Sequence, residues 1–316
     1  GTPSRRGGIE AMGVRLRCLN ALLRLTAKPA LARTHRPESA AVDLSRASRL
    51  FRQPPHLLRL ERPGPPPLHW ISAGPCQPRR AVLWLHGGGY VAGSPATHQG
   101  MLGRLSRLSG VEVCAPAYRL AQEAPFPAAF DDACAAWEAL RRLGYRPADI
   151  VLGGDSAGGG LALALLAHLG ASGERAAGLV AFSPWTDLTL SGGSVRENAR
   201  RDPLLPPARA GELVAQVMAG ADPADPRASP LFARFEAPPP VLIQLSESEI
   251  LRDDGLRIAE RLRGAGGAVE VQAWPDTPHV WQIFDGWIPE ARAALRQAGE
   301  FIRNVLVQTS LEAEIR

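Results

Sequence analysis

Lysine is almost missing from this sequence, since Lys28 is the only one among 36 basic residues. The formal net charge of +5 at pH 7 is therefore carried by arginine. A nucleic-acid-binding surface would gather basic and aromatic residues on one face, but here the arginines are scattered next to acidic neighbours. The charge pattern therefore argues against a nucleic-acid partner.

Cysteine is also scarce, and its spacing excludes two kinds of site. The cysteines lie too far apart for a metal knuckle or a redox pair, and a chain of 316 residues does not need a disulfide framework. We expect them to be small buried side chains, and we expect neither a metal nor an organic cofactor. The four cysteines are Cys18, Cys76, Cys114 and Cys134.

Long uninterrupted apolar runs are missing too. The segment that comes nearest to a targeting sequence, residues 9–32, is interrupted by Arg15, Arg17, Arg24 and Lys28. The intervals between these charges are too short for a spanning helix, which needs about 20 apolar residues in a row. We expect a soluble, cytoplasmic protein with no stable membrane association.

Alternation of short apolar runs with longer amphipathic ones begins at Leu57 and predicts a mostly parallel sheet with crossover helices. The first two strands, split by a Pro-rich turn, are expected to form a hairpin. The expected strands are 57–61, 68–72, 81–85, 112–116, 150–153, 178–182, 241–245 and 269–273. The expected helices include 130–143, 161–169, 255–263 and 291–307.

The chain is longer than most chains that fold around a single hydrophobic core, yet no break in composition separates two domains. Residues 187–230 interrupt the alternation with many prolines and glycines and read as an insertion. Together with residues 1–50, they are expected to form a cap over the carboxyl ends of the strands, where open α/β sheets bind ligands. Residues 51–186 and 231–316 are then the two parts of the core.

The strongest chemical signal is the pentapeptide Gly154-Asp155-Ser156-Ala157-Gly158, which directly follows an apolar run and opens a helical one. A strand-to-helix turn this tight strains the serine backbone, requires small neighbours and exposes the hydroxyl. We predict that Ser156 is a nucleophile. The N–H group of Ala157 would be one donor of an oxyanion hole, because the helix N-terminus favours negative charge.

His86-Gly87-Gly88-Gly89-Tyr90 ends an earlier strand, about 70 residues before the serine. Glycines let a backbone approach a reacting carbonyl closely. The N–H groups of Gly87 and Gly88 are expected to complete the oxyanion hole with Ala157. His86 itself is expected to be structural, fixing the loop by a hydrogen bond.

The base must follow the last strand, because enzymes with a nucleophile turn of this kind carry their catalytic residues in the order serine, acid, histidine. His279 alone meets this condition. The acid is expected in the loop after strand 241–245, where Glu247, Glu249, Asp253 and Asp254 all compete. Asp253 stands just before a helix and could serve only as a cap, whereas Glu249 lies within the loop and could orient the imidazole. We prefer Glu249 and keep Asp253 as the alternative.

Together, residues 86–90, 154–159 and Pro278-His279 resemble the hormone-sensitive-lipase family of microbial esterases. Residues 117–123 and 183–188 look like that family's DYRLAPE and SPW-x-DL segments, so the likeness covers nearly the whole chain. The resemblance implies an α/β-hydrolase fold, with a mostly parallel central sheet of about eight strands, flanking helices and a helical cap.

The family usually carries aspartate as the first residue of a D-P-L-R-D-E-G stretch, and the register of the resemblance places Glu249 there. The resemblance also implies a homodimer. The expected activity is hydrolysis of small short- to medium-chain carboxylic esters through an acyl-enzyme. Amide, carbamate or thioester hydrolysis by the same triad, and a non-catalytic receptor on this scaffold, are the alternatives.

Overall fold

The computed structural model describes residues 13–315 and contains one eight-stranded sheet. The strand order is β1-β2-β4-β3-β5-β6-β7-β8; β1 and β2 form an antiparallel hairpin, β2 pairs antiparallel with β4, and the other pairs are parallel. All eight predicted strands are confirmed, with the hairpin and the α/β-hydrolase architecture. Their bounds are β1 Leu58–Arg62, β2 Leu68–Ser72, β3 Ala81–Leu85, β4 Glu112–Pro116, β5 Ile150–Asp155, β6 Gly178–Phe182, β7 Val241–Ser246 and β8 Val269–Trp274.

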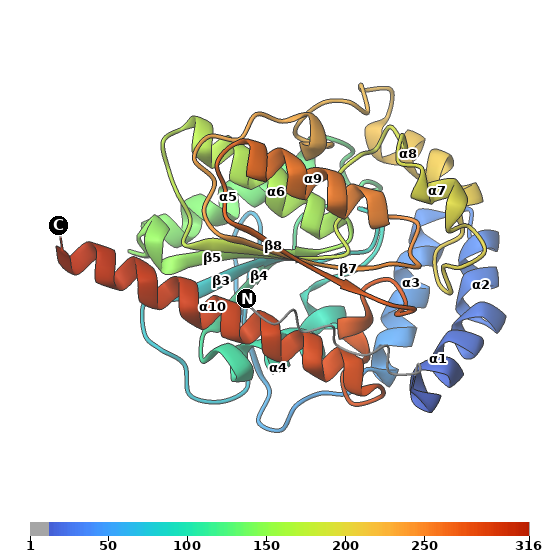
Figure 1. The fold of residues 1–316 in the computed structure, drawn as a ribbon, viewed down its shortest axis with the longest axis horizontal. Helices are drawn as coiled ribbons and strands as arrows, with labels where there is room; N and C mark the ends of the chain where they lie inside the picture. Colours follow the sequence, from blue (N-terminus) through green and yellow to red (C-terminus); the bar gives the residue numbers. More distant parts are fainter. Residues whose placement is uncertain (1–12, 316) are drawn as a thin grey trace, which may run out of the picture.

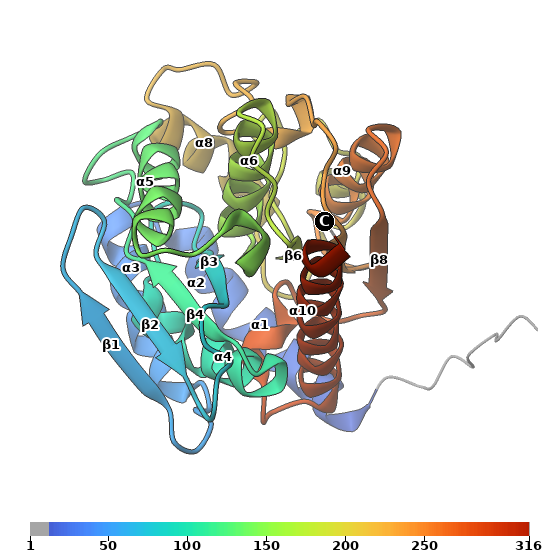
Figure 2. The same ribbon diagram turned by 90° about the vertical axis from the view of Figure 1, so that its left-hand side faces the viewer.

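Helices cover both faces of this sheet (Figures 1 and 2). On one face lie α5, α6 and α9, and on the other lie α4 and α10. Strands β3, β5, β6 and β7 are therefore buried along their whole length, which explains why their sequences are mostly apolar. The helices are α4 Pro95–Ser109, α5 Ala128–Arg142, α6 Ala157–Ala171, α9 Arg252–Gly264 and α10 Pro289–Ile315.

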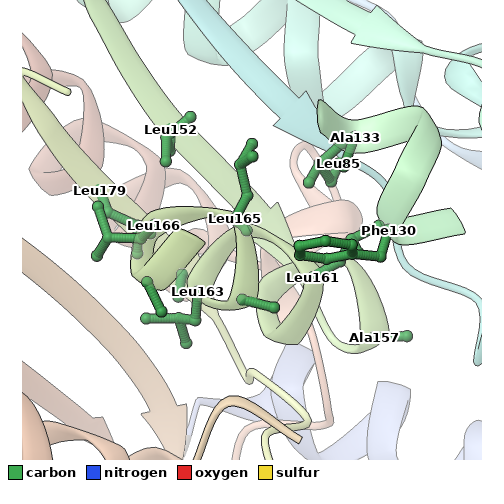
Figure 3. Packing of buried hydrophobic residues seen from close by; sticks show 14 of the residues in the cluster. Leu85, Phe130, Ala133, Leu152, Ala157, Leu161, Leu163, Leu165, Leu166 and Leu179 are labelled. Carbon is green, nitrogen blue, oxygen red and sulfur yellow. The ribbon is translucent and has the colours of Figure 1, made fainter. Parts of the chain in front are cut away.

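Helix α6 is the most buried of these helices, and it begins directly after the candidate nucleophile. Only His168 and the last residue, Ala171, are exposed along it, because the helix lies over the sheet between α5 and α9. A helix that is apolar all round is a buried one. Figure 3 shows Leu161 and Leu165 of α6 in one cluster with Phe130 of α5 and Leu152 of β5. This packing fixes the start of α6, and with it the turn that follows β5, relative to the sheet.

The N-terminal helices α1–α3 and the insertion lie next to one another at one end of the sheet (Figure 1). Lys28 donates from α2 to the carbonyl oxygens of Ala199 and Asp202, and Arg209 donates to Thr34 O at 2.8 Å. Residues 1–12 of the predicted N-terminal segment lie outside the described residues. The helices are α1 Val14–Leu25, α2 Ala27–Arg33, α3 Pro37–Ala47, α7 Ser194–Glu197 and α8 Ala210–Met218, with short 3₁₀ turns at Ser48–Leu50, Pro147–Asp149, Pro207–Arg209, Pro230–Phe232 and Trp281–Phe284.

The cysteines correct one expectation. All four are free thiols, but only Cys114, on β4, is buried. Cys18 lies on the outward side of α1 and is exposed, since the inward side carries Leu16, Leu19 and Leu23. Position on the helix, not residue type, decides its burial. Separately, no helix within residues 13–315 combines the length and apolar character needed to cross a membrane.

Candidate active site

Ser156 occupies the turn between β5 and α6 with backbone angles φ 53° and ψ −124°. A positive φ is strained for a residue with a side chain, so the turn needs support from its neighbours. A Cβ at Gly154 would collide with Gly158 O, and a Cβ at Gly158 would collide with Leu85 O. The glycines of the motif therefore allow the tight turn that presents the serine hydroxyl.

His279 and Glu249 reach the serine from the two loops that follow β8 and β7. His279 Nε2 lies 2.8 Å from Ser156 Oγ, and His279 Nδ1 lies 2.7 Å from Glu249 Oε2. The three side chains form one hydrogen-bonded chain, although 123 and 30 residues separate the two bonded pairs in sequence. The structure thus brings the three predicted residues together at the carboxyl ends of parallel strands.

The alternative acid, Asp253, lies in the first turn of α9, and its carboxylate binds other groups than His279. Its Oδ2 accepts the Ser194 N–H at 2.9 Å, and its Oδ1 accepts from the Arg252 guanidinium at 3.0 Å. Glu249, by contrast, is fully buried, and its Oε1 accepts the Ser246 N–H at 2.9 Å. That bond leaves Oε2 aimed at the imidazole.

The electrostatic surroundings of His279 favour its charged form. Burial lowers the pKa of this imidazole, but the hydrogen bond and charge of Glu249 raise it, with smaller contributions from Asp202 and Asp155. The net result is a His279 pKa above the ordinary value. An imidazole in this setting can accept the serine proton and be stabilised as imidazolium.

The glycine loop differs from the expectation at one position. The Gly87 N–H donates to Asp155 Oδ2 at 3.0 Å, so it is already bonded to a buried carboxylate and does not suit the expected oxyanion role. Within the described residues, the N–H groups of Gly88 and Gly89 donate to no hydrogen bond. Ala157 is the first residue of α6, where N–H groups have no partner inside the helix.

His86 is structural, as its surroundings indicate. Its ring stacks on Tyr118 with centroids 4.2 Å apart, and the Tyr118 hydroxyl donates to His86 O at 2.6 Å. Burial, together with the charge of His98, lowers the pKa of His86 to about 3. The imidazole is therefore neutral at any working pH, and it fixes the loop instead of exchanging protons.

Asp155 is a site residue that the sequence reasoning missed. It is buried and accepts from Trp84 Nε1 at 2.9 Å, while His98 Nε2 lies 3.2 Å from its Oδ2. With the Gly87 contact, these bonds tie the glycine loop to the residue before Ser156. The signal that could have revealed it is an acidic residue inside a pentapeptide whose other residues are small and uncharged.

The buried pair His98–Asp155 should make stability depend on pH. Burial alone would raise the pKa of Asp155, but the charge and hydrogen bond of His98 outweigh burial, so the Asp155 pKa is lowered. Burial alone would lower the pKa of His98, but the charge and hydrogen bond of Asp155 outweigh burial, so the His98 pKa is raised. Stabilisation from a raised histidine pKa is fully present below about pH 6.5, its unfolded value, and is lost as pH rises through the folded pKa. For Asp155 it is present above about pH 3.9 and is lost as pH falls through the depressed pKa.

We therefore expect the difference in unfolding free energy between wild type and His98→Gln to be largest between about pH 4 and 6.5 and to shrink above that range. Urea denaturation of both proteins at several pH values measures it. The subtraction removes groups common to both proteins, among them His279. Parallel pH profiles for the two proteins would contradict a charged His98.

The chain is similar to known hydrolases in sequence. A family model for the alpha/beta hydrolase fold matches residues 82–283. An acetyl-hydrolase of Streptomyces hygroscopicus is 38% identical over 250 residues, covering 76% of this chain and 84% of that protein. The carboxylesterase/phospholipase LipF of Mycobacterium tuberculosis is 38% identical over 238 residues, covering 73% of this chain and 64% of that protein.

Solved structures show the same similarity. EstE5 soaked by ethyl alcohol has a TM-score of 0.89 and 34% identity, with 93% of this chain and 99% of that one covered. An esterase from the bacterial hormone-sensitive lipase family has a TM-score of 0.88 and 36% identity, with 94% and 100% covered. The chain therefore belongs to the α/β-hydrolase family, and within it to the hormone-sensitive-lipase group of esterases.

Proposed function

We propose that this serine carboxylesterase hydrolyses short- to medium-chain carboxylic esters through an acyl-enzyme formed on Ser156. The observation that carries the assignment is the continuous hydrogen-bonded chain from Ser156 Oγ through His279 to Glu249, with contacts of 2.8 and 2.7 Å. A hydroxyl is a weak nucleophile until an adjacent base accepts its proton. Its relatives are acetyl-hydrolases and carboxylesterases, which fits ester cleavage.

The proposed reaction begins when Ser156 Oγ attacks the ester carbonyl carbon and its proton passes to His279 Nε2. Glu249 holds the Nδ1 proton and stabilises the imidazolium. The tetrahedral intermediate collapses as His279 gives its proton to the leaving alcohol oxygen. Water, deprotonated by the same nitrogen, then attacks the acyl carbon. As this second intermediate collapses, His279 gives the proton to Ser156 Oγ, which releases the acid and restores the free serine. No step uses a metal or an organic cofactor.

For the oxyanion hole we propose the N–H groups of Gly88, Gly89 and Ala157. Gly88 and Ala157 are kept from the sequence analysis, and Gly89 replaces Gly87, because the Gly87 N–H is bonded to Asp155. Gly88 and Gly89 adopt φ values of 122° and 62°, which side chains rarely allow. Backbone donors fixed in this way need no reorganisation when charge develops on the carbonyl oxygen.

The cap is proposed to consist of residues 1–50 and 187–230, with residues 51–186 and 231–316 as the core. Contacts of Lys28 and Arg209 across the two cap segments support this division for the described residues. None of the large hydrophobic side chains exposed in the described part of the chain comes from residues 187–230. An insertion that exposes no such side chain suits dissolved small esters better than an oil surface. The exposed large hydrophobic side chains of the cap all belong to its N-terminal segment, namely Val14, Leu22, Leu25, Leu31, Val42 and Leu50.

Three further proposals concern partners and location. A cytoplasmic location is supported by the four free thiols, which a reducing compartment preserves. A homodimer is supported by the two end strands, β1 and β8, each of which leaves one edge of the sheet unpaired by this chain. The scattered arginines support the proposal of no nucleic-acid partner and no stable membrane association.

A panel of chromogenic esters from acetate to palmitate, assayed beside an anilide of a short acid, tests the reaction class. We expect the short- and medium-chain esters to give the highest kcat/KM, palmitate to give less, and the anilide to react most slowly because an anilide nitrogen leaves less readily than an oxygen. Palmitate as the best substrate would contradict the substrate range. An anilide that outpaces every ester would favour amide hydrolysis, and binding without turnover would favour a receptor.

A further inference from the structure

The peptide group that follows Glu249 is held at both of its polar atoms by the insertion. Its carbonyl oxygen, Glu249 O, accepts from Asn198 Nδ2 at 2.8 Å. Its N–H, on Ile250, donates to Asp202 Oδ2 at 2.9 Å. Asn198 and Asp202 are 1% and 0% exposed, so water does not compete for these bonds. We call these two residues the acid clamp.

The acid clamp is itself rigid. The Asp202 N–H donates to Asn198 O at 2.8 Å, which joins the two residues in one turn. Asp202 Oδ1 accepts the N–H groups of Leu204 and Leu205 at 2.8 and 2.9 Å. Asn198 Nδ2 also donates to Glu247 O at 3.0 Å, so the clamp holds the acid loop on both sides of Glu249.

Lys28 connects this turn to the N-terminal helices. From α2, its ammonium group donates to Ala199 O at 2.7 Å and to Asp202 O at 2.6 Å, 171 and 174 residues away. Those carbonyl oxygens belong to the same turn as the acid clamp. A continuous path of hydrogen bonds therefore runs from α2 through the turn at 198–202 to the backbone of Glu249 and on to His279.

Position matters here because the acid acts only through the short contact between Glu249 Oε2 and His279 Nδ1, which is 2.7 Å long. A displacement of about 1 Å at a catalytic group can cost about 100-fold in rate. Glu249 has a longer side chain than aspartate, with one more rotatable bond, so its carboxylate is less constrained by the backbone alone. The Ser246 N–H constrains that carboxylate through Oε1, and the clamp constrains the backbone from which the side chain extends.

We propose that Asn198 and Asp202 are positioning residues for the catalytic acid Glu249, and that Lys28 makes this positioning depend on the N-terminal helices being in place. Neither clamp residue takes part in a proton-transfer step. The inference rests on the proposed function, because it requires Glu249 to be the triad acid. It adds that the insertion and α2 are structural parts of the triad, besides forming a cap.

A double-mutant cycle with Asp202→Asn and Glu249→Gln tests the proposal. Alone, Asp202→Asn should lower kcat by about 10- to 100-fold with KM changed by less than about twofold, because only the transition state loses its oriented acid. In the Glu249→Gln background the same change should cost less than about twofold, since the residue it positions is gone. Asp222→Asn, at an exposed carboxylate of the same insertion, is the matched control and should match wild type.

The pH profile of kcat/KM gives a readout that loss of stability alone would not move. The charged groups that raise the pKa of His279 are Glu249, Asp202 and Asp155. Removing the Asp202 charge, or letting Glu249 drift, lowers that pKa, so the acid limb of the profile should move to lower pH in Asp202→Asn. In Asn198→Ala, a weaker contact to Glu249 should move it in the same direction.

Lys28→Met keeps the apolar stem of the side chain and removes its donors, so kcat should fall by less than in Asp202→Asn. Losses that add fully across the cycle, or an unmoved acid limb in folded Asn198→Ala, which keeps the Asp202 charge, would overturn the clamp. Wild-type kcat in Lys28→Met would overturn the link to α2. Full activity of Glu249→Gln would instead show that the proposed acid is wrong, which separates that failure from failure of the clamp.

Discussion

Replacing Ser156 with alanine is expected to lower kcat for a short-chain ester by about 10⁶-fold, and His279→Ala by a similar factor. The two side chains act as one unit, because the hydroxyl attacks only as its proton moves across the 2.8 Å contact to Nε2. Steady-state kinetics with a chromogenic acetate measure both variants. What remains should come from the oxyanion donors and substrate binding.

Folding has to be checked independently for this pair of variants. Alanine keeps the Cβ of Ser156, so the strain of the positive φ is unchanged and Ser156→Ala is expected to fold as well as wild type. Circular dichroism melts report on this. Wild type should be labelled at Ser156 by an organophosphate, and Ser156→Ala should not. Turnover close to wild type in either folded variant would refute the nucleophile and base assigned here.

Replacing Glu249 with alanine is expected to lower kcat by about 10⁴-fold, as loss of a triad acid does. The acid holds the Nδ1 proton at 2.7 Å and stabilises the imidazolium that forms at His279. Kinetics of Glu249→Ala and Asp253→Ala under identical conditions give the ranking.

Asp253→Ala is the matched comparison for that experiment, since it removes a carboxylate four residues away that bonds to the Ser194 N–H and to Arg252. Loss of such a contact at a helix start costs about 1 kcal/mol of stability. Its kcat should therefore stay within about threefold of wild type while its melting temperature falls. The reverse ranking, with Asp253→Ala the more damaged enzyme, would move the acid to Asp253.

Strand positions could be predicted closely, because a strand buried on both faces must be an apolar run of limited length. The start of α6 could be predicted only in part. The nucleophile turn predicts a helix that begins just after Ser156, as the structure shows, whereas the apolar run alone marks residues 161–169. The helix includes Gly158, Gly159 and Gly160 despite their low helix propensity. A Cβ at Gly160 would collide with Trp185 O, so close packing of the helix on a neighbouring loop, invisible in sequence, requires those glycines.

The assignment of oxyanion donors shows the same limit. The sequence shows the number and order of the glycines in the loop. Which of their N–H groups remain free depends on the position of the Asp155 carboxylate in the folded protein. That carboxylate is positioned in turn by Trp84 and His98, which come from different parts of the chain. Hydrogen-bond partners distant in sequence leave no local pattern.

By itself, the sequence determined the architecture, the nucleophile turn and the choice of His279, because strand periodicity, a strained turn that needs glycine and the order of loops along a sheet are properties of short segments. Only the tertiary structure decided which acid meets the imidazole, which glycine N–H groups are free and how Asn198, Asp202 and Lys28 hold the acid loop. Those choices depend on distances between segments that only folding brings together, at a scale where one ångström changes the chemistry.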